Sequence, residues 1–124
     1  MAFLTISVLF ILINTSGFCQ THKYFLDDGV VTASQLSSEK YLLELDTKDG
    51  VQELQFQYHA RENGMYVYDL IKIGEEELSE NQKSISSLRT KGNFSDLCDG
   101  KPARLFLEIL GESEIITLGS ASMD

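Results

Sequence analysis

The sequence contains no tryptophan, one proline and two cysteines among its 124 residues. One proline excludes proline-rich and collagen-like architectures, and two cysteines are too few for a disulfide-dense scaffold. Basic residues are scarce too, since 10 Lys and Arg face 19 Asp and Glu for a formal net charge of −9. Nucleic acids and anionic membrane surfaces attract basic proteins, so neither is expected as a partner. The apolar fraction of 43% is that of a globular chain, and the length suits one domain.

A long apolar run occurs only at the N-terminus, where residues 1–13 carry no charged side chain. The run is too short to cross a bilayer as a helix, and polar and then small residues follow it, as in a secretory signal peptide. Small residues at Gly17 and Cys19 favour cleavage before Gln20, with cleavage before Phe18 as the alternative. We therefore expect residues 1–19 to be a signal peptide and the mature protein to be secreted and extracellular, with no membrane anchor.

The partner of Cys98 depends on that cleavage site. Cleavage before Gln20 removes Cys19 and leaves Cys98 as the one cysteine of the mature chain. An odd cysteine in a secreted protein suggests a free thiol or an intermolecular bond, here a disulfide-linked dimer. Cleavage before Phe18 would instead allow a disulfide between Cys19 and Cys98.

Two opposite environments are open for the Cys98 thiol. One is burial as a small apolar side chain. The other is a wet loop, because acidic residues and a glycine surround it at Asp96, Asp99 and Gly100. An exposed thiol in the oxidising secretory route would form the dimer in part, or be capped by a small thiol.

Turn signals and strand-like segments alternate along the rest of the chain. The strongest signal is Asn63-Gly64, which suits a type I′ hairpin. Apolar side chains alternate with glutamines from Leu54 to Tyr58, the period of a strand with one wet face. Segments 41–45, 51–58 and 65–73 therefore predict a three-strand antiparallel meander. Further strand-like segments lie at residues 23–26, 30–32, 105–110 and 115–118.

One stretch has a helical pattern instead. Ser79 and Gln82 fit a capping box, which predicts a short helix at about residues 79–90 followed by a loop at residues 91–93. Together the patterns predict a mainly β (α+β) fold in which residues 20–124 form a single domain. We expect an antiparallel sheet of about five strands with one or two short helices.

Residues that could carry enzyme or metal chemistry are few and scattered. His22 and His59 have no further ligands at metal-binding spacing, and the acidic stretch from Glu75 to Glu80 has the pattern of a solvated face. The sequence has neither a nucleophile elbow nor a phosphate-binding glycine loop. We therefore expect a protein that is not an enzyme, with no catalytic or cofactor-binding residues, no metal site and no cofactor. One modification is predicted, because Asn93-Phe94-Ser95 is an N-glycosylation sequon in an expected loop.

The order and spacing of a set of residues resemble those of a known family. These residues are Asp28, Gly29, Val31, Thr32, Leu36, Leu43, Glu44, Leu45, Asp49, Gly50, Phe56, Leu70, Ile71, Gly74, Glu75, Gln82, Leu97, Cys98, Glu114, Ile115 and Ile116. Over roughly residues 24–120 the chain resembles the N-terminal, BRICHOS-like region of the secreted Out at first protein family. The family continues into a large cysteine-rich half, so the chain resembles a short or truncated relative, in which the usual partner of Cys98 lies beyond residue 124.

The resemblance implies a fold and a role. BRICHOS domains are antiparallel sheets flanked by helices, several of them chaperones against β-aggregation, and Out at first proteins are secreted and linked to development. The resemblance thus implies a secreted, non-enzymatic extracellular protein with a developmental or chaperone-like role and an extracellular protein partner. Strand 65–73 would then expose an apolar face or edge to clients, unless it is a plain core strand. The alternative is a small secreted protein-binding factor, such as an inhibitor or immune modulator.

Overall fold

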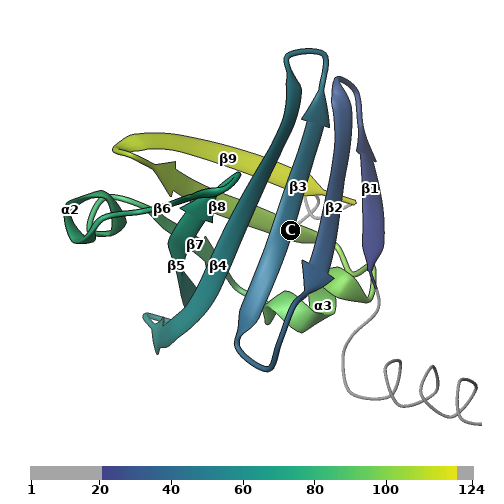
Figure 1. Ribbon diagram of the computed structural model, residues 1–124. Coiled ribbons are helices and arrows are strands. Elements are labelled where there is room, and N and C mark those ends of the chain that lie inside the picture. Colours follow the sequence, from purple (N-terminus) through teal and green to yellow (C-terminus); the bar gives the residue numbers. More distant parts are fainter. Residues whose placement is uncertain (1–20, 120–124) are drawn as a thin grey trace, which may run out of the picture.

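The computed structural model describes residues 21–119, which form one antiparallel sheet and two short helices. Eight strands neighbour one another in chain order: β1 (His22–Leu26), β2 (Gly29–Gln35), β3 (Lys40–Thr47), β4 (Gly50–Glu62), β5 (Met65–Ile73), β7 (Ser87–Thr90), β8 (Ala103–Ile109) and β9 (Glu112–Leu118). A two-residue strand, β6 (Glu76–Glu77), pairs with β5, and the helices are α2 (Glu80–Lys83) and α3 (Phe94–Cys98). The sheet curls into a nearly closed barrel (Figure 1).

Tight turns make the antiparallel connections. Asn63 and Gly64 have φ angles of 54° and 80°, as a type I′ turn requires, so the hairpin predicted from this dipeptide is confirmed. Leu110 and Gly111, with φ angles of 51° and 89°, turn the chain between β8 and β9 in the same way. Positive φ is uncommon for leucine, and here the Leu110 amide donates a hydrogen bond to Ser86 Oγ at 2.9 Å, which holds the turn in place.

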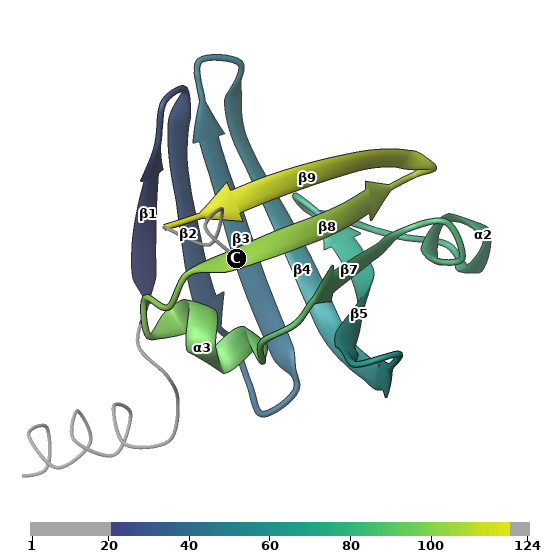
Figure 2. The ribbon, with the colours of Figure 1, turned by 180° about the vertical axis from the view of Figure 1, so that it is seen from behind.

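The long strand β4 bends the sheet. Its pairing with β5 shifts register between Gln55 and Phe56 and again between Tyr58 and Ala60. Such irregularities bend a strand and increase its twist. In Figure 2, β8 and β9 accordingly cross β1 to β4 at a steep angle, so that one face of the curled sheet packs against itself.

Every second side chain along the strands points into the barrel, as the period of a half-buried strand requires. The strand residues of the hydrophobic core cluster are Tyr24, Val31, Ala33, Tyr41, Leu43, Leu54, Phe56, Tyr68, Leu70, Leu88, Leu105, Leu107 and Leu118. Helix α3 closes one end by adding Phe94, Leu97 and Cys98 to this core.

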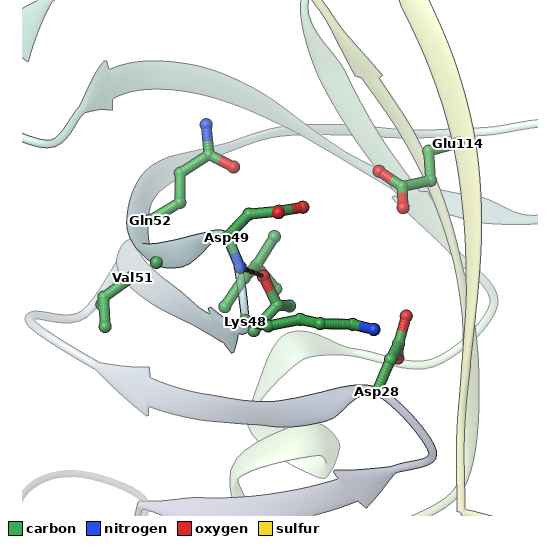
Figure 3. A pocket seen from close by; sticks show the side chains of 9 residues that line it. Asp28, Lys48, Asp49, Val51, Gln52 and Glu114 are labelled. Atoms are coloured by element: carbon green, nitrogen blue, oxygen red, sulfur yellow. Dashed lines mark hydrogen bonds between the residues drawn. The ribbon is translucent and has the colours of Figure 1, made fainter.

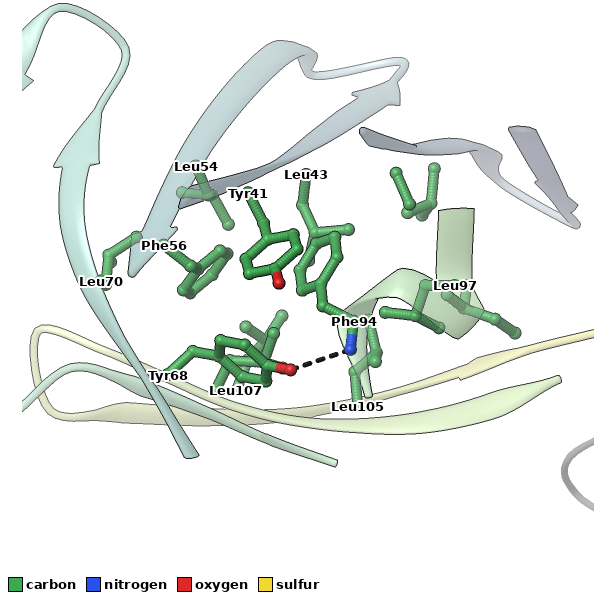
Figure 4. Packing of buried hydrophobic residues seen from close by; sticks show 14 of the residues in the cluster. Tyr41, Leu43, Leu54, Phe56, Tyr68, Leu70, Phe94, Leu97, Leu105 and Leu107 are labelled. Atoms are coloured by element: carbon green, nitrogen blue, oxygen red, sulfur yellow. Dashed lines mark hydrogen bonds between the residues drawn. The ribbon is translucent and has the colours of Figure 1, made fainter. Parts of the chain in front are cut away.

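Phe94 is the centre of an aromatic cluster that fills the interior (Figure 4). Its ring stacks on Tyr41, with 4.6 Å between centroids, and meets Tyr68 edge-on at 5.6 Å. The Phe94 amide donates to the Tyr68 hydroxyl oxygen at 2.8 Å, so ring and backbone of the same residue are both held. Burial raises the pKa of Tyr68, and the Phe94 amide only partly opposes this.

The predicted mainly β, antiparallel fold with few short helices is confirmed, as is the meander of residues 41–73. The number of strands is wrong, since eight strands and β6 replace the expected five. The helix predicted over residues 79–90 is also too long. Its capping box forms, with Ser79 and Gln82 bonded in both directions, but α2 ends at Lys83 and residues 87–90 form β7.

Two local interactions explain why this helix stops. The Ser86 hydroxyl donates to the Gln82 carbonyl at 2.8 Å and accepts the Leu110 amide, so it ties the end of α2 to the β8–β9 turn. Beyond it, Leu88 and Thr90 point into the core while Arg89 faces solvent, which is a period of two. A serine at a helix end and a long-range strand pairing thus override the local helical pattern.

Replacing Phe94 by alanine should destabilise the fold by about 3–5 kcal/mol, because it opens a cavity between three aromatic rings. Phe25→Ala is the matched control, since Phe25 lies on the outer face with 78% of its surface exposed. Phe25→Ala should lower the free energy of unfolding by less than about 1 kcal/mol. Urea unfolding of both variants measures the difference, and equal destabilisation would contradict the role given to Phe94.

Candidate functional site

The barrel fails to close along one line, which we call the seam, between β1 and β9. These strands are the two ends of the sheet. They approach each other, but no backbone hydrogen-bond ladder joins them within residues 21–119. An unpaired edge exposes backbone donors and acceptors that can pair with another chain. The seam is therefore the natural place to look for an interaction.

The β1–β2 hairpin determines which groups of β1 face the seam. Its loop has two residues, so the flanking pair, Leu26 and Gly29, is hydrogen-bonded and the pairs then alternate. The backbone N–H and C=O groups of Lys23 and Phe25 consequently point away from β2, toward the seam. The side chain of Phe25 is among the most exposed apolar groups of residues 21–119.

The other edge has the same form. Ile109 and Glu112 flank the two-residue β8–β9 turn, so the alternation directs the backbone groups of Ser113, Ile115 and Thr117 toward the seam. Ile115 is 62% exposed on the outer face. Each edge thus combines outward-pointing backbone groups with one large exposed apolar side chain.

Tyr24 closes the seam at the α3 end. Its hydroxyl donates to the Leu97 carbonyl at 2.6 Å and the Lys101 carbonyl at 2.9 Å, both at or just beyond the C-terminal end of α3. The His22 ring packs edge-on against Tyr24 and also lies over Gly100, where a Cβ would come within 2.7 Å of the imidazole. Gly100 has a φ of 89°, so glycine suits both the backbone and this close approach.

The same contacts change the acidity of the Tyr24 phenol. Burial raises the pKa of Tyr24 to about 12, and the neighbouring Cys98, Asp99 and Asp96 act in the same direction. The neutral, donating form is therefore the one that folding stabilises.

At its other end the seam widens into a cavity of about 570 Å³, which we call the mouth (Figure 3). Asp28 of the β1–β2 turn lies on one side of the mouth and Glu114 of β9 on the other. The β3–β4 turn, with Lys48 and Asp49, contributes a further wall. The seam is thus V-shaped, closed by Tyr24 and open at the mouth.

The mouth is acidic. It has three carboxylates, on Asp28, Asp49 and Glu114, against one ammonium group, on Lys48. None of these four belongs to an ion pair within 4 Å among the described residues; the pairs there are His59–Asp69, Lys83–Glu80 and Lys101–Asp96. A concave surface lined by one sign of charge concentrates ligands of the opposite sign. The mouth therefore favours cationic groups.

The two predicted site residues lie at α3, away from the mouth. Asn93 caps the helix, and its Oδ1 accepts the Ser95 amide at 3.1 Å. An N-linked glycan attaches to the other amide atom, Nδ2, so the cap and the predicted glycan are compatible. Cys98 is 1% exposed, in line with the burial alternative. The other alternative, a wet loop around Cys98, is wrong, because residues 94–98 are helical and the thiol is buried.

Other expectations have different outcomes. The disulfide-linked dimer stays a prediction, and residues 1–19, with Cys19, lie outside the described residues. Segment 65–73 is a core strand whose edges both pair, with β4 and with β6 and β7, so it is not the open edge that clients would need. In residues 21–119 no three His, Cys, Asp or Glu side chains gather as a metal site would require. Within that range no helix has the length and hydropathy needed to span a bilayer.

Comparison with known families, curated proteins and solved structures yields no match to this chain. The function must therefore be argued from the residues themselves. No local pattern marked Phe25, Asp28 or Glu114 as site residues. Their position could have been inferred only from the rule that the first and last strands of a meander are its edges.

Replacing Tyr24 by phenylalanine should lower the free energy of unfolding by about 1–3 kcal/mol, because the Leu97 carbonyl loses its donor. The loss should depend on pH. A folded-state pKa raised from 10 to about 12 stabilises the fold fully below pH 10 and progressively less as pH rises through 12. Urea unfolding measures the difference in free energy of unfolding between wild type and variant at pH 8 and at about pH 11.5, which lies between the two pKa values. The difference should be smaller at the higher pH. A constant difference would contradict the assignment.

Two variants of Asn93 separate its cap from its glycan. Asn93→Asp keeps a capping oxygen but removes the sequon, so it should lose the glycan mass and keep its stability. Asn93→Ala should lose both, at a cost of about 1 kcal/mol. Intact mass of the secreted proteins and thermal unfolding together test this. A wild-type mass without any glycan, differing from that of Asn93→Asp by the amide-to-acid change alone, would show that the sequon is not used.

Proposed function

We propose that this chain is a secreted, non-enzymatic extracellular protein that binds an extended segment of another protein along the seam. The observation that carries the proposal is the pair of unpaired edges, each with an exposed apolar side chain, Phe25 or Ile115. Strand addition to such an edge supplies affinity through backbone hydrogen bonds and selectivity through alternate side chains. The function therefore belongs to the backbone of β1 and β9 rather than to a catalytic group.

The barrel interior supports a protein ligand over a small molecule. Small-molecule barrels keep a cavity among their inward-facing side chains. Here the rings of Tyr41, Phe56, Tyr68 and Phe94 occupy that space in mutual contact. A ligand must therefore bind outside the barrel interior, and we propose the seam and its mouth as that surface.

Two kinds of binding protein fit this geometry. The first is a BRICHOS-like protein of the Out at first type, in a developmental or chaperone-like role, since an antiparallel sheet with short helices is the architecture that this resemblance implies. The second is a binding factor, such as an inhibitor or immune modulator, with one tight partner. A chaperone-like edge would accept several unrelated extended segments, whereas a binding factor would accept one.

Photo-crosslinking tests the seam as the binding surface. A photoreactive phenylalanine analogue is placed at position 25 or 115, and the labelled protein is added to medium from cells that secrete the wild-type protein. Both positions should then form covalent adducts with the same partner or partners. The analogue at position 36 is the matched control, because Leu36 is 44% exposed but lies in the β2–β3 turn outside the seam. The number of partners separates the two kinds of protein.

Adducts that form equally from position 36 would contradict the proposal, as would a lack of adducts from both edge positions. Thermal unfolding of the three labelled proteins should agree with that of wild type, since all three sites are exposed.

A further inference from the structure

We infer that the seam takes a basic, extended segment of a partner protein, about five to seven residues long, added as a strand to the β9 edge where the seam opens toward the mouth. This inference rests on the proposed function and specifies the chemistry of the partner. It follows from the length of the two edges, from the charge around the mouth and from the direction of the side chains on each edge.

The length follows from the edges. β1 has five residues and β9 has seven, and a strand rises about 3.3 Å per residue. The matching segment therefore spans about 17–23 Å. Because Tyr24 closes the α3 end of the seam, the segment would lie mainly in the open part, near the mouth.

The charge follows from the mouth. Asp28 and Glu114 face each other across it, Asp49 adds a third carboxylate, and Glu112 lines the adjoining cavity. Asp27 continues the acidic surface beyond β1. A lysine or arginine side chain that points inward from an inserted strand would meet these carboxylates, which have no described ion pair of their own.

The side-chain pattern follows from the alternation of strands. On the outer face an inserted strand would lie beside Phe25 and Ile115, which favour apolar or β-branched neighbours. On the inner face, near the mouth, it would lie beside carboxylates. The fitting sequence therefore alternates apolar and basic residues.

A second copy of this chain fits the seam poorly. The protein has a formal net charge of −9, and acidic residues lie at the mouth end of both edges, in the turn after β1 and at the start of β9. Two copies brought together there would place like charges opposite one another, which disfavours association. The charge of the whole chain and the charge of the mouth both select a basic partner.

Two synthetic peptides provide the test. One is a capped heptapeptide of alternating lysine and valine, and its matched control alternates glutamate and valine. Isothermal titration calorimetry at low ionic strength should detect binding of the lysine peptide to the wild-type protein and none of the glutamate peptide. Binding should weaken in 0.5 M salt (roughly a 4 Å Debye length), because exposed charges are screened.

Protein variants then locate the site. Asp28→Asn combined with Glu114→Gln should weaken the lysine peptide about three- to tenfold. The matched control, Glu75→Gln with Glu76→Gln, removes two exposed carboxylates far along the chain from the seam and should leave affinity unchanged. Ser113→Pro removes an edge N–H beside the mouth without breaking the β8–β9 ladder. It should abolish binding, and it leaves the charge of the protein unchanged.

The outcomes separate the two claims. Equal binding of both peptides would overturn the inference of a basic partner, and so would equal weakening by the seam pair and the control pair of substitutions. Crosslinks from positions 25 and 115 would still support the proposed function in that case. Unchanged binding to Ser113→Pro, confirmed as folded by circular dichroism, would show that the seam edge is not used and would overturn both.

Discussion

The packing of the Phe94 ring against both Tyr41 and Tyr68 holds the barrel together. A sheet of eight strands that curls on itself leaves an interior that aliphatic side chains from the strands do not fill alone. One ring from a five-residue helix fills it, and the same residue's amide is bonded to the Tyr68 hydroxyl. The Asn93 cap fixes where that helix begins. A short helix that would be unstable in isolation is thus held by burial at one residue and by a cap at another.

The position of α3 then determines the shape of the seam. Once Phe94 is buried, the end of the helix presents the Leu97 carbonyl beside β1, where Tyr24 donates to it. This anchors one end of an edge strand that has only β2 as a hydrogen-bonded neighbour. Within residues 21–119 the opposite end has no equivalent contact and ends in the Asp28 turn, so the edges separate there. The packing inside the barrel therefore determines where β1 and β9 separate and the seam opens.

The sequence predicts the local parts of this arrangement and misses those that depend on distant partners. The Asn63-Gly64 hairpin and the alternation around Phe56 are encoded in neighbouring residues, and both were predictable. β7 was not, because Ser87–Thr90 becomes a strand only by pairing with β5 and β8. Helix α3 has five residues and no helical period to detect. The seam itself depends on the first and last strands meeting, which no local pattern specifies.

An open edge is usually a liability, because unpaired backbone invites aggregation, and proteins commonly protect edges with charge, proline or short strands. Here β1 is short and carries Lys23, yet it also exposes Phe25 beside the outward-pointing backbone groups. The protection comes instead from the acidic mouth and the charge of the whole chain, which repel further copies. That form of protection is selective, since it opposes acidic chains and attracts basic ones. The carboxylates that would oppose a second copy at the seam are thus the same residues that we propose determine what it binds.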